Sequence, residues 1–144
     1  MIRLAEENDL PILLRMGKAF FDASGYNKET EFNELDTKEM LKKLIEAGSL
    51  LTDGKSGMIG FLVFPIFMNN SHLIAQELFW WVDEDKRKTK LGLNLLQAAE
   101  KAAKDQGASS MLMLSLNDLN GEKVNNLYKS LGYSARETTY MRSL

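Results

Sequence analysis

Two long apolar runs in the middle of the chain constrain its fold more than any other feature. They span Met58–Met68 and His72–Val82, and only Asn69-Asn70-Ser71 lies between them. Strands joined by so short a turn pair antiparallel, so the centre of the chain predicts a long hairpin. A second hairpin is predicted just before it, because the strand Leu50–Thr52 is followed by Asp53–Gly57, whose residues tolerate positive φ. A purely parallel, doubly wound sheet is excluded, since two hairpins have no place at its centre.

The remaining elements follow from apolar periodicity, helix caps and turn residues. We predict a strand at Ile2–Leu4, a helix from Asn8 or Asp9 to about Phe21, a helix at Lys38–Ala47 capped by Thr37, a helix at Leu91–Gln106, a strand at Ser110–Leu116, a helix at Gly121–Leu131 and a final strand at Thr138–Arg142. The resulting order, β-α-α-β-β-β-α-β-α-β, predicts an α/β (α+β) domain with a mixed sheet and helices on both faces.

Composition fits one globular domain, which we expect to span residues 1–144. The chain has no cysteine, which excludes disulfides, zinc–thiolate sites and thiol nucleophiles. A single histidine, His72, excludes a multi-histidine metal site, so we expect no metal. The net charge of −2 does not favour nucleic acid. No apolar run reaches the roughly 20 residues of a membrane span, and no signal-peptide pattern is present, so we expect a cytoplasmic protein with no membrane partner.

A basic turn after the second long strand is the segment with the clearest chemical signal. The strand ends at Val82, a helix is expected to begin near Lys90, and Lys86, Arg87 and Lys88 lie between them. A helix start gathers unpaired backbone amides and the positive end of the helix dipole, which together suit a pyrophosphate. Most charge runs, however, are solvated surface, and the spacing alone favours that interpretation.

Four segments carry motifs that, taken in chain order, point to a family. They are Ile2-Arg3-Leu4-Ala5 with Asp9-Leu10-Pro11, then Val82-x-x-x-x-Arg87-x-x-Lys90-x-Gly92 with Leu95-Leu96, then Ala98-Ala99-Glu100 through Gly107-Ala108, and finally Leu127-Tyr128-Lys129-Ser130-Leu131-Gly132-Tyr133. Together they resemble the GNAT family of N-acetyltransferases over nearly the whole chain. The resemblance implies a mixed, mostly antiparallel sheet of six to seven strands, and acetyl-CoA as the co-substrate.

The resemblance also implies roles for particular residues. Glu77 is the candidate general base, although an open position at the end of the sheet is an equal alternative. Tyr128 is the candidate acid for the departing thiolate, although its spacing also fits a packed aromatic. The residues implied to hold acetyl-CoA are Trp80, Trp81, Val82, Arg87, Lys88, Thr89, Lys90, Leu91, Gly92, Leu93 and Asn120. For Asn120, capping of the last helix is the favoured alternative.

The motif departs from the family at two positions, because Lys88 and Lys90 stand where glycine is usual. If position 90 required a left-handed conformation, lysine would cost roughly 1–2 kcal/mol. If it lies in the first helical turn, lysine costs little and adds a counter-charge for phosphate, and this is the case we expect. The affinity for acetyl-CoA is the property that these changes affect.

The acceptor is expected to bind beside the segment between the first two helices, where Tyr26 and Phe32 are candidate contacts for a cationic amine. A solvated polar loop is an equal alternative. The rival hypothesis is a GNAT-fold protein that binds coenzyme A or regulates a partner without catalysis. A nucleic-acid-binding domain that uses Lys86–Lys90 requires a wider basic face than the net charge suggests. A homodimer is expected by analogy alone.

Overall fold

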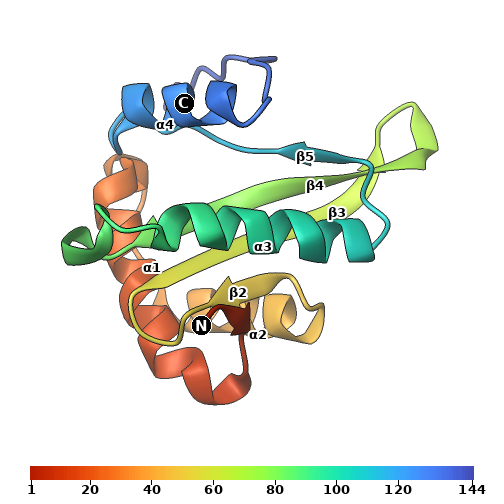
Figure 1. The fold of residues 1–144 in the computed structure, drawn as a ribbon. Coiled ribbons are helices and arrows are strands. Elements are labelled where there is room, and N and C mark those ends of the chain that lie inside the picture. The colour runs from red at the N-terminus through yellow and green to blue at the C-terminus, as the bar shows by residue number, and fades with distance from the viewer.

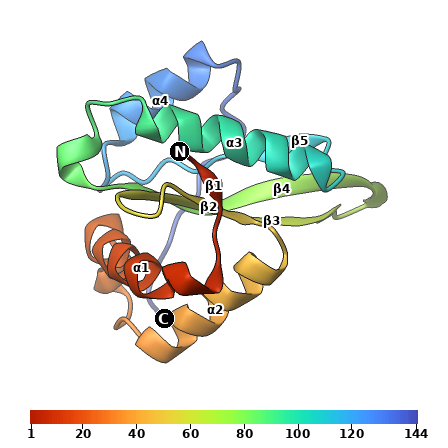
Figure 2. The same cartoon turned by 60° about the horizontal axis from the view of Figure 1, so that its bottom comes forward.

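The computed structural model describes residues 1–144 and has three layers. A five-stranded sheet in the order β1-β2-β3-β4-β5 forms the middle layer. Helices α1 and α2 cover one face, and α3 and α4 lie on the other (Figures 1 and 2). The sequence therefore predicted the layers correctly, but the expected six to seven strands were too many.

The strands are β1 (Arg3–Leu4), β2 (Leu50–Thr52), β3 (Gly57–Ile66), β4 (Asn69–Val82) and β5 (Ser110–Leu112). The helices are α1 (Leu10–Ser24), α2 (Glu34–Glu46), α3 (Leu91–Asp105) and α4 (Gly121–Ser130), with short 3-10 turns η1 (Glu7–Asp9), η2 (Tyr26–Lys28) and η3 (Glu84–Lys86).

Each face of the sheet has its own apolar core, because successive strand residues point to opposite faces. The first core joins α1 and α2 to the sheet through side chains that include Leu13, Leu41 and Met58. The second joins α3 and α4 to the sheet through Ile59, Phe61, Leu95, Leu96, Ala99 and Tyr128 among others. Met58 and Ile59 are neighbours in β3 that belong to different cores, which fixes the register of the strand.

The central hairpin is present as predicted, but its turn lies earlier in the chain. β3 and β4 pair antiparallel from Gly57↔Val82 to Ile66↔Asn69, so the turn is Phe67–Met68 rather than Asn69–Ser71. Met68 in this turn has a positive φ of 76°. The pairing also slips between Gly60 and Phe61, which leaves Leu78 of β4 unmatched as a bulge.

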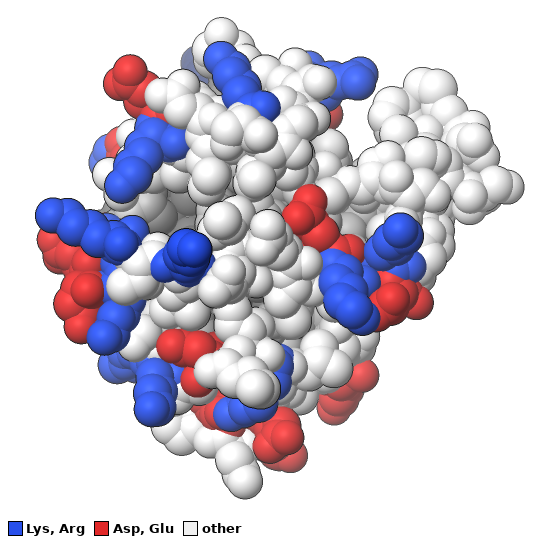
Figure 3. Space-filling model, viewed as in Figure 1, with Lys and Arg blue, Asp and Glu red and all other residues white.

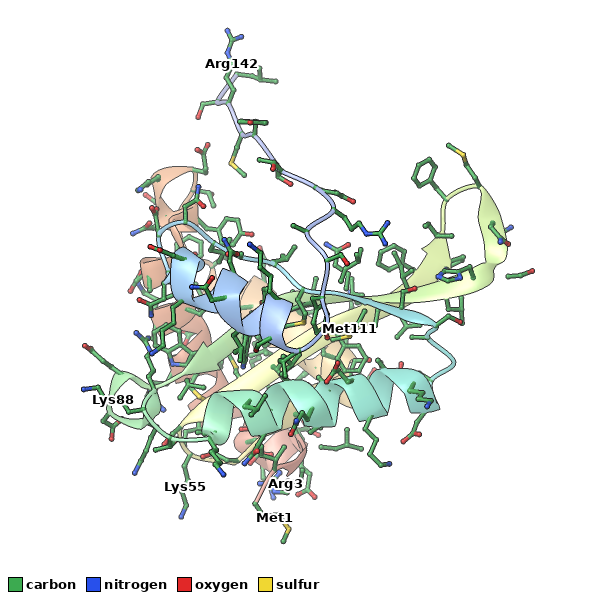
Figure 4. All side chains as sticks on the ribbon, turned by 45° about the horizontal axis from the view of Figure 1, so that its top comes forward. Met1, Arg3, Lys55, Lys88, Met111 and Arg142 are labelled. Carbon is green, nitrogen blue, oxygen red and sulfur yellow. The ribbon has the colours of Figure 1, made fainter.

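Three further predictions are corrected. The final strand at Thr138–Arg142 is absent, and the C-terminal segment instead crosses to the α1 and α2 side, where the Ser143 hydroxyl donates to Glu29 at 2.9 Å (Figure 2). Figure 4 shows Arg142 far from Met111 of β5. The β-propensity of Thr138–Arg142 does not produce a strand, because no neighbouring strand is there to pair with it.

Helix α2 begins at Glu34, because the Asn33 side chain, not Thr37, caps it by accepting from the Asp36 amide at 2.9 Å. The strand expected to reach Leu116 ends at Leu112, for a reason given below.

We predict that Gly60→Ala destabilises the protein by about 1–3 kcal/mol. A methyl group at position 60 would lie 2.5 Å from Phe79 Cζ, inside the first core. Gly17→Ala in α1 is the matched control. There the added carbon meets Thr37 at an ordinary 3.5 Å, and alanine should stabilise the helix by roughly 0.5–1 kcal/mol. Urea unfolding of both variants measures the difference, and equal effects would contradict this packing.

Candidate active site

β4 and β5 separate part-way along their length, and the candidate site lies at this split. They pair in parallel only at Ile74↔Ser110, Ala75↔Met111 and Gln76↔Leu112. From Glu77 to Val82, β4 therefore pairs with β3 along one edge and has no strand along the other. The unpaired edge presents backbone donors and acceptors to any extended group placed beside it.

Glu77 occupies the first position of the split and is 5% exposed, so the alternative of an open, solvated carboxylate is not what the structure shows. Its Oε1 accepts a hydrogen bond from the Leu114 amide at 2.9 Å, in place of a bond from strand to strand. Burial raises the pKa of Glu77 from its ordinary 4.5 to about 7, while the Leu114 amide and the nearby Tyr128 hydroxyl oppose the rise. A carboxyl group with this pKa exchanges its proton near neutral pH.

Tyr128 of α4 also contacts Leu114, the residue whose amide donates to Glu77. Its hydroxyl donates to the Leu114 carbonyl at 2.6 Å, and its ring stacks on Trp80 with centroids 6.1 Å apart. Burial, and next the charge of Glu77, raise the pKa of Tyr128, so the phenol stays protonated at neutral pH. Tyr128 thus packs as an aromatic and also brings its hydroxyl to the Glu77 side of the split.

Leu114 links the two candidate groups, and sequence reasoning missed it. Its N–H donates to the Glu77 carboxylate and its C=O accepts from the Tyr128 hydroxyl, so side chains satisfy both of its backbone groups. This explains why β5 ends at Leu112 and not at Leu116. No residue-type signal could have revealed the role, because it belongs to the backbone.

The turn ahead of α3 and the first turn of the helix present free backbone amides. The N–H groups of Lys88, Lys90, Gly92 and Leu93 have no acceptor within the chain, while the Thr89 hydroxyl accepts from the Leu91 amide at 3.2 Å. Lys90 has a φ of −81° and Lys88 is not left-handed, so lysine costs no backbone strain at either position. Figure 4 places Lys88 in the turn ahead of α3. On this side of the molecule a hollow lies between the start of α3 and α4, with basic side chains at its rim (Figure 3).

Arg87 and Trp81 brace the end of β4. The Arg87 Nε donates to the Val82 carbonyl at 2.9 Å, and its guanidinium lies 4.7 Å from the Trp81 ring centroid. The Trp81 indole N–H donates to Asp83 at 2.8 Å, and Asp83 is also paired with Arg15 at 2.8 Å. These contacts hold the turn that leads into α3.

The remaining predicted residues lie in different places. Asn120 occupies the N-cap position of α4, as expected, but it has a left-handed conformation with φ 54° and its side chain makes no capping bond. Tyr26 packs on Phe20, whose ring lies 6.3 Å from that of Phe79 on β4. Phe32 packs on Phe21 instead and lines a groove of about 920 Å³ between α1 and α2, to which no β4 residue contributes.

An ion pair that the sequence did not signal joins η2 to the segment between β5 and α4. Lys28 of η2 contacts Asp118, in the segment between β5 and α4, at 2.6 Å. The two residues are 90 positions apart, so only the fold brings them together.

In the whole structure, no group of three or more histidine, cysteine or carboxylate side chains is arranged to hold a metal ion. No helix combines the length and the apolar character needed to cross a membrane.

Comparisons with known proteins identify relatives of this fold. The model of the acetyltransferase (GNAT) family matches residues 17–133. No curated protein sequence matches the chain. A solved structure of a transcriptional regulator from Bacillus halodurans C-125 is 17% identical with a TM-score of 0.77, and the match covers 100% of this chain and 99% of that one. Ribosomal-protein-alanine N-acetyltransferase from Brucella melitensis biovar Abortus 2308 is 15% identical with a TM-score of 0.73, covering 100% and 98%. AAC(6')-Iy in complex with a bisubstrate analogue, CoA-S-monomethyl-acetylneamine, is 13% identical with a TM-score of 0.76, covering 100% and 97%.

We predict that Glu77 makes stability depend on pH in a direction opposite to that of most carboxylates. Its folded-state pKa of about 7 exceeds its ordinary 4.5, so the folded protein binds the proton more tightly. Its contribution is full below pH 4.5 and is lost as the pH rises to 7. Glu77→Gln keeps an acceptor for Leu114 without a charge, and should gain up to about 3 kcal/mol over wild type across this interval. Urea unfolding at several pH values tests this, and a constant difference would contradict the buried, titrating carboxyl.

Proposed function

The chain belongs to the acetyltransferase (GNAT) family, and from this premise we propose that it is an enzyme that moves an acetyl group from acetyl-CoA to a primary amine. The observation that carries the proposal is the meeting of Glu77 and Tyr128 on Leu114, where β4 becomes free along one edge. We propose further that residues 1–144 act as one catalytic domain.

The residues at the start of α3 fit acetyl-CoA. Four amides without acceptors, with Lys88 and Lys90 beside them, suit a diphosphate. The free edge of β4 from Trp80 to Val82 suits the amides of an extended pantetheine arm. The unused Asn120 side chain supplies a further polar group at the start of α4. When bound, acetyl-CoA supplies the acetyl thioester, and these residues hold and orient it.

Glu77 is the proposed general base. A lysine-like amine has a pKa near ~10.4, so removing its proton at pH 7 costs roughly 4–5 kcal/mol. The carboxylate accepts this proton, directly or through a water molecule, and its pKa of about 7 lets it exchange a proton near neutral pH. Its burial beside apolar side chains strengthens the interaction with a cationic amine.

Tyr128 is the proposed acid, whose hydroxyl donates to the departing thiolate of coenzyme A. Its hydroxyl now donates to Leu114, so this role requires it to exchange that acceptor for the thiolate. The raised pKa keeps the phenol protonated, so its hydroxyl is available to donate a hydrogen bond to the charge that develops on the sulfur.

The proposed acceptor site lies on the α1–α2 side of the split. Tyr26 connects to β4 through Phe20, and the exposed ion pair between Asp118 and the Lys28 ammonium supports Asp118 as a proposed counter-charge for a cationic amine. Phe32 is a proposed outer contact at the groove between α1 and α2. We propose a cytoplasmic location, given a chain without cysteine.

We also propose a homodimer, supported by the tip of the β3–β4 hairpin. There Phe67 is 77% exposed and Met68 is 91% exposed. The hairpin carries no lysine, arginine, aspartate or glutamate between Ser56 and Gln76, and it projects from the body (Figures 1 and 3). A second copy would cover this surface.

We predict that the protein releases free coenzyme A thiol from acetyl-CoA in the presence of pooled primary amines. Glu77→Gln should lower the rate at least about 100-fold and Tyr128→Phe by a smaller factor. Glu46→Gln and Tyr140→Phe change the same residue types at exposed positions and should leave it unaltered.

Unchanged rates in both active-site variants would refute the assigned roles. Binding of acetyl-CoA without thiol release from any amine would favour the rival hypothesis, a protein that binds coenzyme A without catalysis.

A further inference from the structure

The two tryptophans of the chain differ in one respect that bears on ligand binding. Trp80 and Trp81 are neighbours in β4 whose side chains belong to opposite faces of the sheet. The indole N–H of Trp81 donates to Asp83 at 2.8 Å. The indole nitrogen of Trp80 is buried and has no hydrogen-bond partner, and no other buried side-chain nitrogen or oxygen in the protein lacks one. A buried indole N–H normally has an acceptor, because leaving it without one opposes folding.

The position of Trp80 places this unsatisfied donor beside the proposed acetyl-CoA site. Trp80 follows Glu77 along the unpaired edge of β4 and stacks on Tyr128. The Trp80 Cζ2 atom lies 3.5 Å from the point where a Cβ of Gly92 would be. The Trp80 Cε2 atom, which is bonded to the indole nitrogen, lies 4.0 Å from the same point. This edge of the indole therefore faces Gly92 in the first turn of α3, where the Gly92 and Leu93 amides also have no acceptor. The unsatisfied Trp80 donor thus lies on the side of β4 that faces the start of α3, where backbone amides also lack acceptors.

We propose that the Trp80 indole N–H donates a hydrogen bond to an oxygen of bound acetyl-CoA, in either its diphosphate or its pantetheine amides. The inference rests on the proposed function, since it assigns a binding residue to that same site. Only an acceptor satisfies an N–H, and both parts of the ligand carry oxygens that act as acceptors. Because the nitrogen is covered in this structure, the Tyr128 ring or the first turn of α3 shifts to admit the ligand. Such local adjustments are common on binding.

The chain offers a direct measurement, because two tryptophans give two indole N–H signals in a ¹⁵N–¹H correlation spectrum. The signal that disappears in Trp81→Phe belongs to Trp81, so the other is assigned without altering Trp80. On titration with acetyl-CoA, we expect the Trp80 signal to move downfield as its proton gains an acceptor. Trp80→Phe should weaken the binding of acetyl-CoA about tenfold by calorimetry, with the exposed Tyr140→Phe as control.

Two smaller probes locate the acceptor oxygen. A shift of the Trp80 signal with inorganic pyrophosphate supports a bond to the diphosphate, and a shift with pantetheine supports a bond to an amide carbonyl. If acetyl-CoA binds by calorimetry but the Trp80 signal stays in place, the inference is overturned while the proposed function stands. If calorimetry detects no binding of acetyl-CoA, the proposed function fails and the inference falls with it.

Discussion

The hydrogen bond from the Leu114 amide to Glu77 marks the point at which β4 and β5 stop pairing. A buried amide needs an acceptor, and the neighbouring strand would normally supply one. Here a carboxylate supplies it, so the Leu114 amide keeps an acceptor although the chain leaves the sheet after Leu112. Because the Glu77 side chain takes the place of a bond from strand to strand, one edge of β4 is left unpaired. The candidate site is therefore a consequence of how one backbone amide is satisfied.

The arrangement also determines the chemistry of Glu77. A carboxyl group buried beside the second core loses hydration, which raises its pKa to about 7. Tyr128 holds the other side of Leu114, so the base and the hydroxyl keep a fixed relation through one residue. A group that exchanges its proton near neutral pH, in a place sheltered from water, has the properties that a general base requires.

The sequence predicted the features that local patterns encode. The long hairpin, the four helices, the two faces of the sheet and the helix start after Val82 were all found, because apolar spacing and turn residues determine them. It failed where distant contacts decide. Thr138–Arg142 has strand propensity but no partner, and Leu114 acts only through its backbone. Lys28 and Asp118 carry no mutual signal across 90 positions.

We propose that the diphosphate of acetyl-CoA binds the free amides of the turn ahead of α3 and of the first turn of the helix. Amide hydrogen exchange, measured residue by residue with and without acetyl-CoA, tests this most directly. We expect exchange to slow at Lys88, Lys90, Gly92 and Leu93, because these N–H groups gain acceptors that the chain itself does not provide. Unchanged exchange at these four amides, with the protein saturated by acetyl-CoA, would contradict it.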